Sequence, residues 1–256
     1  MISLSAHAGK IVSRLRDSSL ALLCPQECRV CGGMVEAWRD GIACSTCWQE
    51  FDEARQSAEV CAKCGLRLRA APIATTERRC GRCDDLAFTC ARSCGAYEGA
   101  LRESVIRLKE HPQLSGRIRE LLHSTFLSLT KDQTVESVIP VPLHPDRQRV
   151  RGFNQAEVIA RALTALTNPE VDTVSLVREK KTEMHRAGMS LAVRARSLEM
   201  AFKVRAPRLI ENRSVLLVDD LMTTGSTAHE IAGTLLAAGA RSVSVLTLAR
   251  AVTLFQ

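Results

Sequence analysis

The hydrophobic and polar residues of this chain follow one pattern up to about residue 94 and another after it. In the later part, apolar residues recur at helical spacing in some segments and form short consecutive runs in others. The helical spacing predicts helices over 103–111, 115–130, 154–166 and 226–238. The consecutive runs predict strands over 137–143, 172–177, 214–220 and 242–250. Strands that alternate with helices are typical of an α/β fold in which helices flank a parallel sheet.

The earlier part of the chain has poor periodicity and contains all eleven cysteines. This change of pattern predicts two domains, a cysteine-rich domain over 1–94 and an α/β domain over 95–256. No export signal is evident in the sequence, so the cysteines favour metal binding over disulfides.

Eight of the cysteines form four CxxC pairs, which are Cys28/Cys31, Cys44/Cys47, Cys61/Cys64 and Cys80/Cys83. Two such pairs can surround one metal ion with four thiolates, so the pairs predict two structural zinc ions in zinc ribbons. Consecutive pairs would give two separate ribbons and interleaved pairs a cross-braced module, and the spacing is compatible with both. A redox role is the alternative, but four pairs within 56 residues disfavour it. Cys24, Cys90 and Cys94 are left over and are predicted to be small buried apolar residues, with Cys90 and Cys94 as substitute ligands in a rearranged site as the alternative.

The stretch "SVLLVDDLMTTGSTAHE" carries the strongest functional signal, because two aspartates directly follow an apolar run. Asp219 and Asp220 stand at the carboxyl end of a predicted strand, where open α/β sheets bind ligands. The residues that lead into the next helix are Thr223, Thr224, Gly225, Ser226 and Thr227. Hydroxyl groups and the free N–H groups of a helix N-terminus suit a phosphate. The pattern therefore predicts a site for a sugar 5-phosphate, with sugar hydroxyls on the acids and the phosphate in the loop.

Other interpretations of this stretch fit less well. A Walker A loop needs Gly-Lys-Ser or Gly-Lys-Thr, which the sequence lacks. Phosphoacceptor domains have paired acids without the threonine-glycine loop, and a threonine-rich helix cap with no ligand is a further alternative. The stretch from Val215 to Thr227 resembles the 5-phosphoribosyl 1-diphosphate (PRPP) motif of type I phosphoribosyltransferases. This resemblance implies that Asp219 and Asp220 bind the ribose hydroxyls, that 223–227 binds the 5-phosphate, and that magnesium accompanies PRPP.

A second resemblance extends over nearly the whole chain. The segment "IPVPLHPDRQRVRGFNQAEVIAR" at 139–161, the segment that begins at Tyr97 and the closing "VLTLAR" are similar to those of the ComF family. Members of this family combine a double zinc ribbon with a phosphoribosyltransferase-like domain. The resemblance implies a type I phosphoribosyltransferase-like parallel sheet over 95–256 and an N-terminal double zinc-ribbon domain over 1–94. It also implies diphosphate contacts from Val141, Pro142, Leu143, Arg151, Asn154 and Gln155, with Arg151 acting beside the acid pair in catalysis.

Composition and charge narrow the choice of partners. The chain has 256 residues, 46% of them hydrophobic, which is enough for a sizeable core. Its net charge of +7 permits an anionic partner. Most of this excess lies in 178–208, where nine basic residues stand against three acidic ones. That segment, which includes Arg194 and Arg196, is either a solvated helical face or a surface that binds an anion.

Three functions agree with these observations. The first is a phosphoribosyltransferase that acts on an unidentified acceptor. The second is a factor of natural competence that binds single-stranded DNA and uses PRPP or a related sugar phosphate as a ligand, as the ComF resemblance implies. The third is an adaptor that docks a competence helicase or another DNA-processing protein. The apolar run at 20–24 is too short to span a bilayer, so we expect a soluble cytoplasmic protein without membrane insertion.

Overall fold

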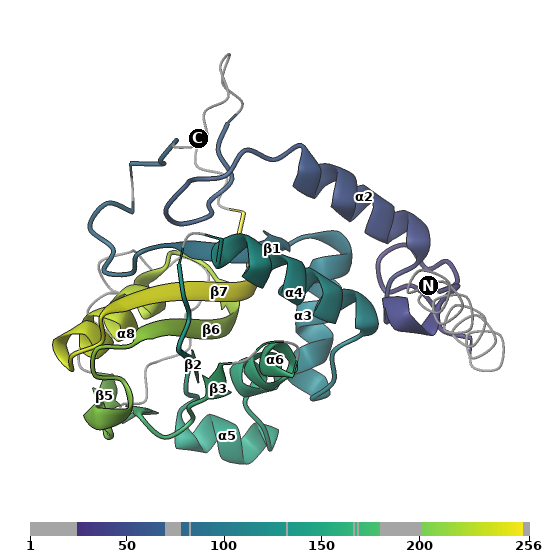
Figure 1. Cartoon of the computed structure of the whole chain (residues 1–256). Helices are drawn as coiled ribbons and strands as arrows, with labels where there is room; N and C mark the ends of the chain where they lie inside the picture. The colour runs from purple at the N-terminus through teal and green to yellow at the C-terminus, as the bar shows by residue number, and fades with distance from the viewer. Residues whose placement is uncertain are drawn as a thin grey trace, which may run out of the picture.

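The computed structural model describes residues 25–69, 78–81, 83–131, 133–165, 167, 169–179 and 201–252. Its centre is a parallel five-stranded sheet in the order β1-β7-β6-β2-β3 (Figure 1). The strands are β1 (Ala91–Ala96), β2 (Ser137–Pro140), β3 (Glu170–Val171), β6 (Ser214–Met222) and β7 (Ser242–Arg250). The predicted α/β fold is therefore confirmed.

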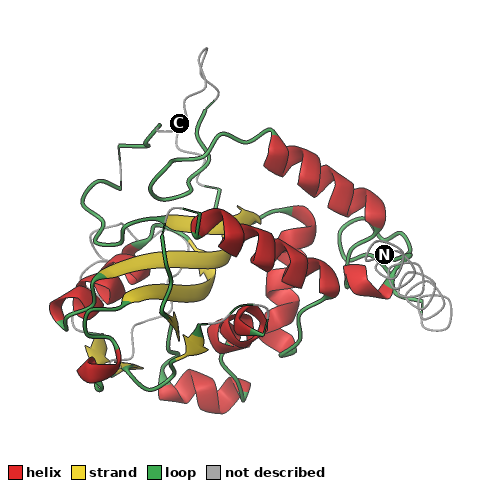
Figure 2. Cartoon of the chain, viewed as in Figure 1, coloured by secondary structure: helices red, strands yellow, loops and turns green. Residues whose placement is uncertain are grey.

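Helices cover both faces of this sheet (Figure 2). They are α3 (Gly99–Glu110), α4 (Gly116–Leu129), α6 (Gln155–Thr164) and α8 (Ser226–Ala237), and the additional short helix α5 (Pro145–Arg151) follows the turn after β2. Side chains alternate along the strands, so Leu216 and Val218 join α3, α4 and α6 in one core. Val215 and Leu217 join α8 in the other core. Both faces of β6 and β7 are therefore buried, which is why these strands read as continuous apolar runs.

The cysteine-rich part packs against this α/β unit. It contains the short helix η1 (Trp38–Asp40) and the helix α2 (Ser45–Gln56). The buried Trp48 of α2 donates a hydrogen bond from Nε1 to the backbone oxygen of Asp40 at 3.0 Å. Arg117 of α4 lies 5.6 Å from the Trp48 ring and pairs with Asp52 of α2. Helix α2 is thus held against α4 by an ion pair and a cation–π contact.

Several elements of the fold are absent from the sequence-based prediction, among them α2, β1 and α5. Strand β1 is an edge strand with the sequence ARSCGA, whose polar residues hide its strand character. Helix α5 has no buried residue and therefore no apolar stripe. Because β1 pairs with β7 along residues 91–96, the sheet takes in the end of the segment 1–94.

The predicted strand 172–177 is wrong as a single strand. The chain forms β3 before it and then the short strand β4 (Leu176–Arg178). Strand β4 pairs antiparallel with β5 (Phe202–Val204) in a separate two-stranded sheet, and η2 (Pro207–Leu209) follows. Asp172 separates β3 from β4, because its Oδ1 accepts hydrogen bonds from the N–H groups of Val174 and Ser175 and closes a turn.

The other predicted helices and strands agree with the structure to within a few residues. Helix α8 ends one residue before the predicted end at 238, and the following Gly239 has a left-handed backbone with φ of 98°. The N–H groups of Gly239 and Ala240 donate to the carbonyl oxygens of Leu236 and Leu235, which completes a Schellman cap. In the described part of the chain, no helix is long and apolar enough to cross a bilayer.

Candidate functional site

The order of the strands defines a crevice at the carboxyl edge of the sheet. After β2 the chain crosses to β3 on one side, whereas after β6 it crosses to β7 on the other side. The loops that leave β2 and β6 therefore diverge, and these two strands are neighbours in the sheet. Ligands of open α/β sheets bind at such a switch point, outside the carboxyl ends of the strands.

The acid pair lies at this edge, on the last residues of β6. Strand β6 continues through Asp219 and Asp220 to Met222, which pairs with Arg250 of β7. The N–H group of Asp220 donates a hydrogen bond to Oδ1 of Asp219 at 2.8 Å. Asp220 Oδ2 lies 3.7 Å from Nζ of Lys109, which comes from α3. Burial, and then the neighbouring charge of Asp220, raise the pKa of Asp219 above its ordinary value.

The loop after the acids turns directly into α8. Gly225 has φ of 88°, and a Cβ at this position would lie 2.8 Å from Cε of Met222, so only glycine fits without strain. The hydroxyl groups of Thr224 and Ser226 are 2.8 Å apart, and Thr224 Oγ1 also accepts from the N–H group of Ser226 at 3.3 Å. The loop therefore presents hydroxyl groups at the N-terminus of a three-turn helix.

Asp219, this loop and Val141 of the turn after β2 meet at one small cavity of about 30 Å³. Its polar or loop residues include Val141, Asp219, Thr223, Gly225 and Thr227. Of the other residues predicted for the site, Pro142, Leu143, Arg151, Asn154, Gln155, Asp220, Thr224 and Ser226 do not line this cavity. The structure also adds Thr247 of β7 to the cavity, a residue that the sequence pattern did not indicate.

The turn after β2 is tied to the fold through Val141 and Asn154. The N–H group of Val141 donates to the carbonyl oxygen of Val218 at 2.9 Å, and its carbonyl oxygen accepts from Nδ2 of Asn154 at 3.0 Å. Asn154 Oδ1 in turn accepts from the N–H group of Ala156 and caps α6. Both backbone polar groups of Val141 are therefore engaged within the protein.

Two other residues of this region retain polar groups for a ligand. The side chain of Gln155 is buried, and its Nε2 has no hydrogen-bond partner within the described residues. Arg151 is half-buried at the end of α5, where Gly152 closes the helix with φ of 81°. A buried amide without a partner is costly, so it marks a position where a ligand or water would be stabilised.

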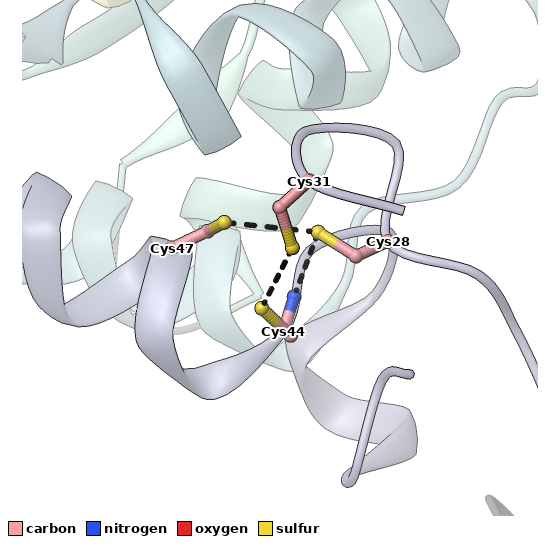
Figure 3. A group of neighbouring side chains, drawn as sticks. All are labelled: Cys28, Cys31, Cys44 and Cys47. Atoms are coloured by element: carbon pink, nitrogen blue, oxygen red, sulfur yellow. Dashed lines mark hydrogen bonds between the residues drawn. The ribbon is translucent and has the colours of Figure 1, made fainter. Parts of the chain in front are cut away.

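The eight cysteines of the CxxC pairs form two groups of four, and each group uses consecutive pairs. The first group is shown in Figure 3, and its sulfur atoms come from the turn at Cys28–Cys31 and from the start of α2. Cys28 and Cys47 are 3.8 Å apart, and Cys31 and Cys44 are 3.6 Å apart. In the second group, Cys61 and Cys83 are 3.6 Å apart, as are Cys64 and Cys80. The question of separate or interleaved ribbons is thus answered in favour of separate ones.

These distances suit zinc. A tetrahedral ion with Zn–S bonds of about 2.3 Å separates its sulfur atoms by roughly 3.8 Å. In each group one thiol is already favoured as the anion that binds metal. Burial raises the pKa of Cys28, but hydrogen bonds from the N–H groups of Cys31 and Cys44 outweigh it and lower that pKa to about 6. Similar bonds from Cys64 and Cys80 lower the pKa of Cys61 to about 6 despite its burial. Both groups of four thiols can therefore hold zinc.

Other sequence predictions are only partly covered by the structure. Cys94 is buried as predicted and Cys90 is half-buried, whereas Cys24 lies outside the described residues. The middle of the basic segment, with Arg194 and Arg196, also lies outside them. Of its described ends, Lys203 and Arg205 both lie within 4 Å of the Glu179 carboxylate, at 3.8 and 3.9 Å. The predicted anion-binding surface at 178–208 stays a prediction.

Comparison with known proteins agrees with this fold and this site. The phosphoribosyl transferase domain family matches residues 107–252. DNA utilization protein YhgH of Salmonella typhimurium is 31% identical over 90% of this chain and 99% of its own length. Competence protein F of Haemophilus influenzae is 29% identical over 88% and 96%, and competence protein ComFC of Bacillus subtilis is 30% identical over 65% and 67%. The chain therefore belongs to the phosphoribosyl transferase domain family and, within it, to the ComF family of competence and DNA utilization proteins.

Proposed function

We propose that this protein binds PRPP at the acid pair and the 223–227 loop and acts in DNA uptake or processing. The observation that carries the proposal is the convergence of Asp219, Thr223 and Thr227 on one cavity at the switch point of the sheet. The carboxylate offers acceptors for ribose hydroxyls, and the hydroxyl-rich helix N-terminus offers donors for a phosphate. The two lie close enough together for one ligand to contact both.

Each part of PRPP has candidate partners. Asp219 and Asp220 would accept hydrogen bonds from the ribose hydroxyls, and Thr223, Thr224, Gly225, Ser226 and Thr227 would hold the 5-phosphate. Val141 and Asn154 would shape the turn at the diphosphate, because their polar groups are engaged with each other. Pro142, Leu143, Arg151 and Gln155 would then contact the diphosphate, with the unpartnered Nε2 of Gln155 and the guanidinium of Arg151 as donors.

Magnesium fits the chemistry of this site. The charge of Asp220 adds to burial in raising the pKa of Asp219, and a divalent cation would relieve that repulsion. Magnesium bound with PRPP would supply positive charge for the leaving diphosphate. The chain itself would orient the ribose through Asp219 and Asp220, and Arg151 would assist departure of the diphosphate.

Phosphoribosyl transfer is the catalytic extension of this proposal. The bond between the anomeric carbon and the diphosphate oxygen would break, and an acceptor atom would form a new bond to that carbon as diphosphate leaves. The domain 95–256 would supply this site, and two structural zinc ions would hold the ribbon domain 1–94.

The alternative is a DNA-binding or adaptor protein that uses this fold without catalysis. The printed names of the relatives, DNA utilization protein and competence protein, favour a role with DNA. In this alternative, single-stranded DNA or a competence helicase would be the partner, in the cytoplasm, and the net charge of +7 would assist DNA binding.

Calorimetric titration of the zinc-loaded protein with PRPP and magnesium tests the proposal. The variant Asp219→Ala/Asp220→Ala should lose binding. The matched control is Asp84→Ala/Asp85→Ala, which removes two adjacent exposed acids elsewhere on the chain and should bind normally. If the unaltered protein binds no PRPP, the proposed ligand is wrong and nucleic acid or a protein becomes the ligand to pursue.

A further inference from the structure

A second and larger cavity lies between the cysteine-rich part and the sheet. Its volume is about 420 Å³, within the range of roughly 300–1,000 Å³ typical of sites for small organic ligands. Its walls come from α2, from the turn of the second cysteine group and from the carboxyl ends of β1 and β7. The walls also include the start of α3 and Thr125 and Ser128 of α4, so the cavity runs along most of the edge strand β1.

The close approach of α2 to β1 forms this cavity. Phe51 of α2 packs so near to β1 that a Cβ on Gly95 would lie 2.5 Å from its ring. Because Gly95 has no side chain, α2 can pack closely against β1, and the cavity lies beside this contact. Cys47 of the first cysteine group also lines the cavity, and Arg250 in its wall contacts Cys64 of the second group.

Four arginines line the cavity, namely Arg55, Arg67, Arg92 and Arg250. None of them forms a salt bridge with a carboxylate in the described part of the chain. The acidic residues among the lining are Glu50 and Glu98, so positive charge is in excess. Guanidinium groups are usually paired with anions when they gather at one place, so this arrangement is suited to an anionic ligand.

The buried Arg250 is a second observation that favours an anion-binding site in this cavity. The residue is only 6% exposed, and its Nη2 lies 3.9 Å from Sγ of Cys64. Its Nε and Nη1 have no hydrogen-bond partner within the described residues. The thiols of the second cysteine group favour the charge of this buried guanidinium, and Arg250 therefore places positive charge at the inner wall of the cavity.

Apolar groups complete the lining and narrow the class of ligand. Phe51, Ala54, Val60, Ala96 and Val252 present aromatic or aliphatic surface beside the arginines. A flat ring on this surface and a phosphate on the guanidinium groups would satisfy both kinds of wall. A nucleoside monophosphate contains both a flat aromatic base and a phosphate in one molecule of suitable size, whereas a sugar phosphate lacks the flat aromatic ring.

We propose that this cavity binds a nucleoside monophosphate, with the phosphate on the arginines and the base against the apolar wall. The site is separate from the acid-pair site, because the two cavities share no lining residue. Arg55 and Arg67 are exposed and stand at the mouth, whereas Arg92 is half-buried and Arg250 buried. The exposed pair can be changed without disturbing the core.

The test is calorimetric titration of the zinc-loaded full chain with AMP. We expect Arg55→Glu/Arg67→Glu to weaken binding by about tenfold or more, since charge-assisted hydrogen bonds to phosphate are stronger than neutral ones. The control Arg213→Glu makes the same change of charge at an exposed arginine before the amino end of β6 and should bind normally. AMP should also bind more tightly than inorganic phosphate or adenosine.

A further variant separates this site from the 223–227 loop. Ser226→Asp places a negative charge where the loop would hold a phosphate, and it should leave AMP binding at the arginine cavity intact. The proposal is overturned if AMP does not bind, or if Ser226→Asp abolishes binding while Arg55→Glu/Arg67→Glu retains it. Competition by a 5′-phosphorylated thymidine oligonucleotide, and none by its 5′-hydroxyl form, would identify a strand end as the source of the nucleotide; competition by neither would identify a free nucleotide.

Discussion

Removing the charge of Asp219 should stabilise the free protein while it weakens PRPP binding. The pKa of Asp219 is raised, first by burial and then by the charge of Asp220, so the folded protein resists ionisation of this carboxyl group. At neutral pH this group therefore destabilises the fold relative to the unfolded chain, in which the carboxyl group ionises freely. The variant Asp219→Asn keeps the shape of the side chain and removes the repelled charge.

The expected gain is about 1 kcal/mol in the free energy of unfolding, the usual scale when a strained functional group is relieved. For a chain of this size it corresponds to a rise in Tm of about 2–4 °C. Urea denaturation and thermal melting of the zinc-loaded protein, without magnesium or PRPP, measure this gain. The control Asp85→Asn removes an exposed charge and should change the free energy of unfolding by less than about 0.5 kcal/mol.

The pH dependence checks the cause. Because the pKa of Asp219 is raised in the folded protein, the difference in free energy of unfolding between Asp219→Asn and the unaltered protein should be largest at pH values above that pKa. The difference should shrink as pH falls through the folded pKa towards the ordinary value of 3.8, because the unaltered folded protein then takes up the proton itself. An Asp219→Asn variant that melts at a lower temperature, or whose gain is constant with pH, would refute this reasoning.

Three further predictions concern the loop, the turn and the metal groups. Gly225→Ala should lower the free energy of unfolding by about 1 kcal/mol in urea denaturation, because φ is 88° and Met222 Cε crowds the new Cβ; an unchanged value would contradict this. Asn154→Ala removes the α6 cap and the bond to Val141 and should cost about 2 kcal/mol by the same measurement, whereas a cost near zero would show that neither bond matters. Cys31→Ala should reduce the zinc content from two ions to one per chain, as measured by plasma mass spectrometry, because the two groups share no thiol; loss of both ions would argue against separate ribbons.

Local patterns in the sequence were sufficient to predict the helices and strands whose apolar residues are buried along most of their length. Helices α3, α4 and α6 each bury an apolar stripe, and β6 and β7 are buried on both faces, so the helical spacing and the continuous apolar runs are visible in the sequence. Strand β1 lies at an edge, and its partners on β7 are more than a hundred residues away in the chain. Its assignment therefore depends on tertiary contacts that no local window contains.

The candidate site shows the same division. The acids and the 223–227 loop are continuous in the sequence, so their proximity could be predicted. The position of Val141 beside them depends on β2 lying next to β6, which is a property of the sheet order. The pairing of the cysteines could not be predicted either, because separate and interleaved ribbons are compatible with the same spacing. Only the three-dimensional structure distinguishes them.

The position of β7 in the sheet affects the order in which the parts of the protein can fold. Strand β7 is the last of the five strands to be synthesised, yet it lies between β6 and β1. Until it emerges from the ribosome, β1 has no partner in the sheet, and β6 has one edge bare beside the acid pair. The cysteine groups can bind metal early because each is local, whereas the carboxyl edge of the sheet is completed only after β7 has been made. The two parts of the protein can therefore fold at different times, and residues 242–250 join them.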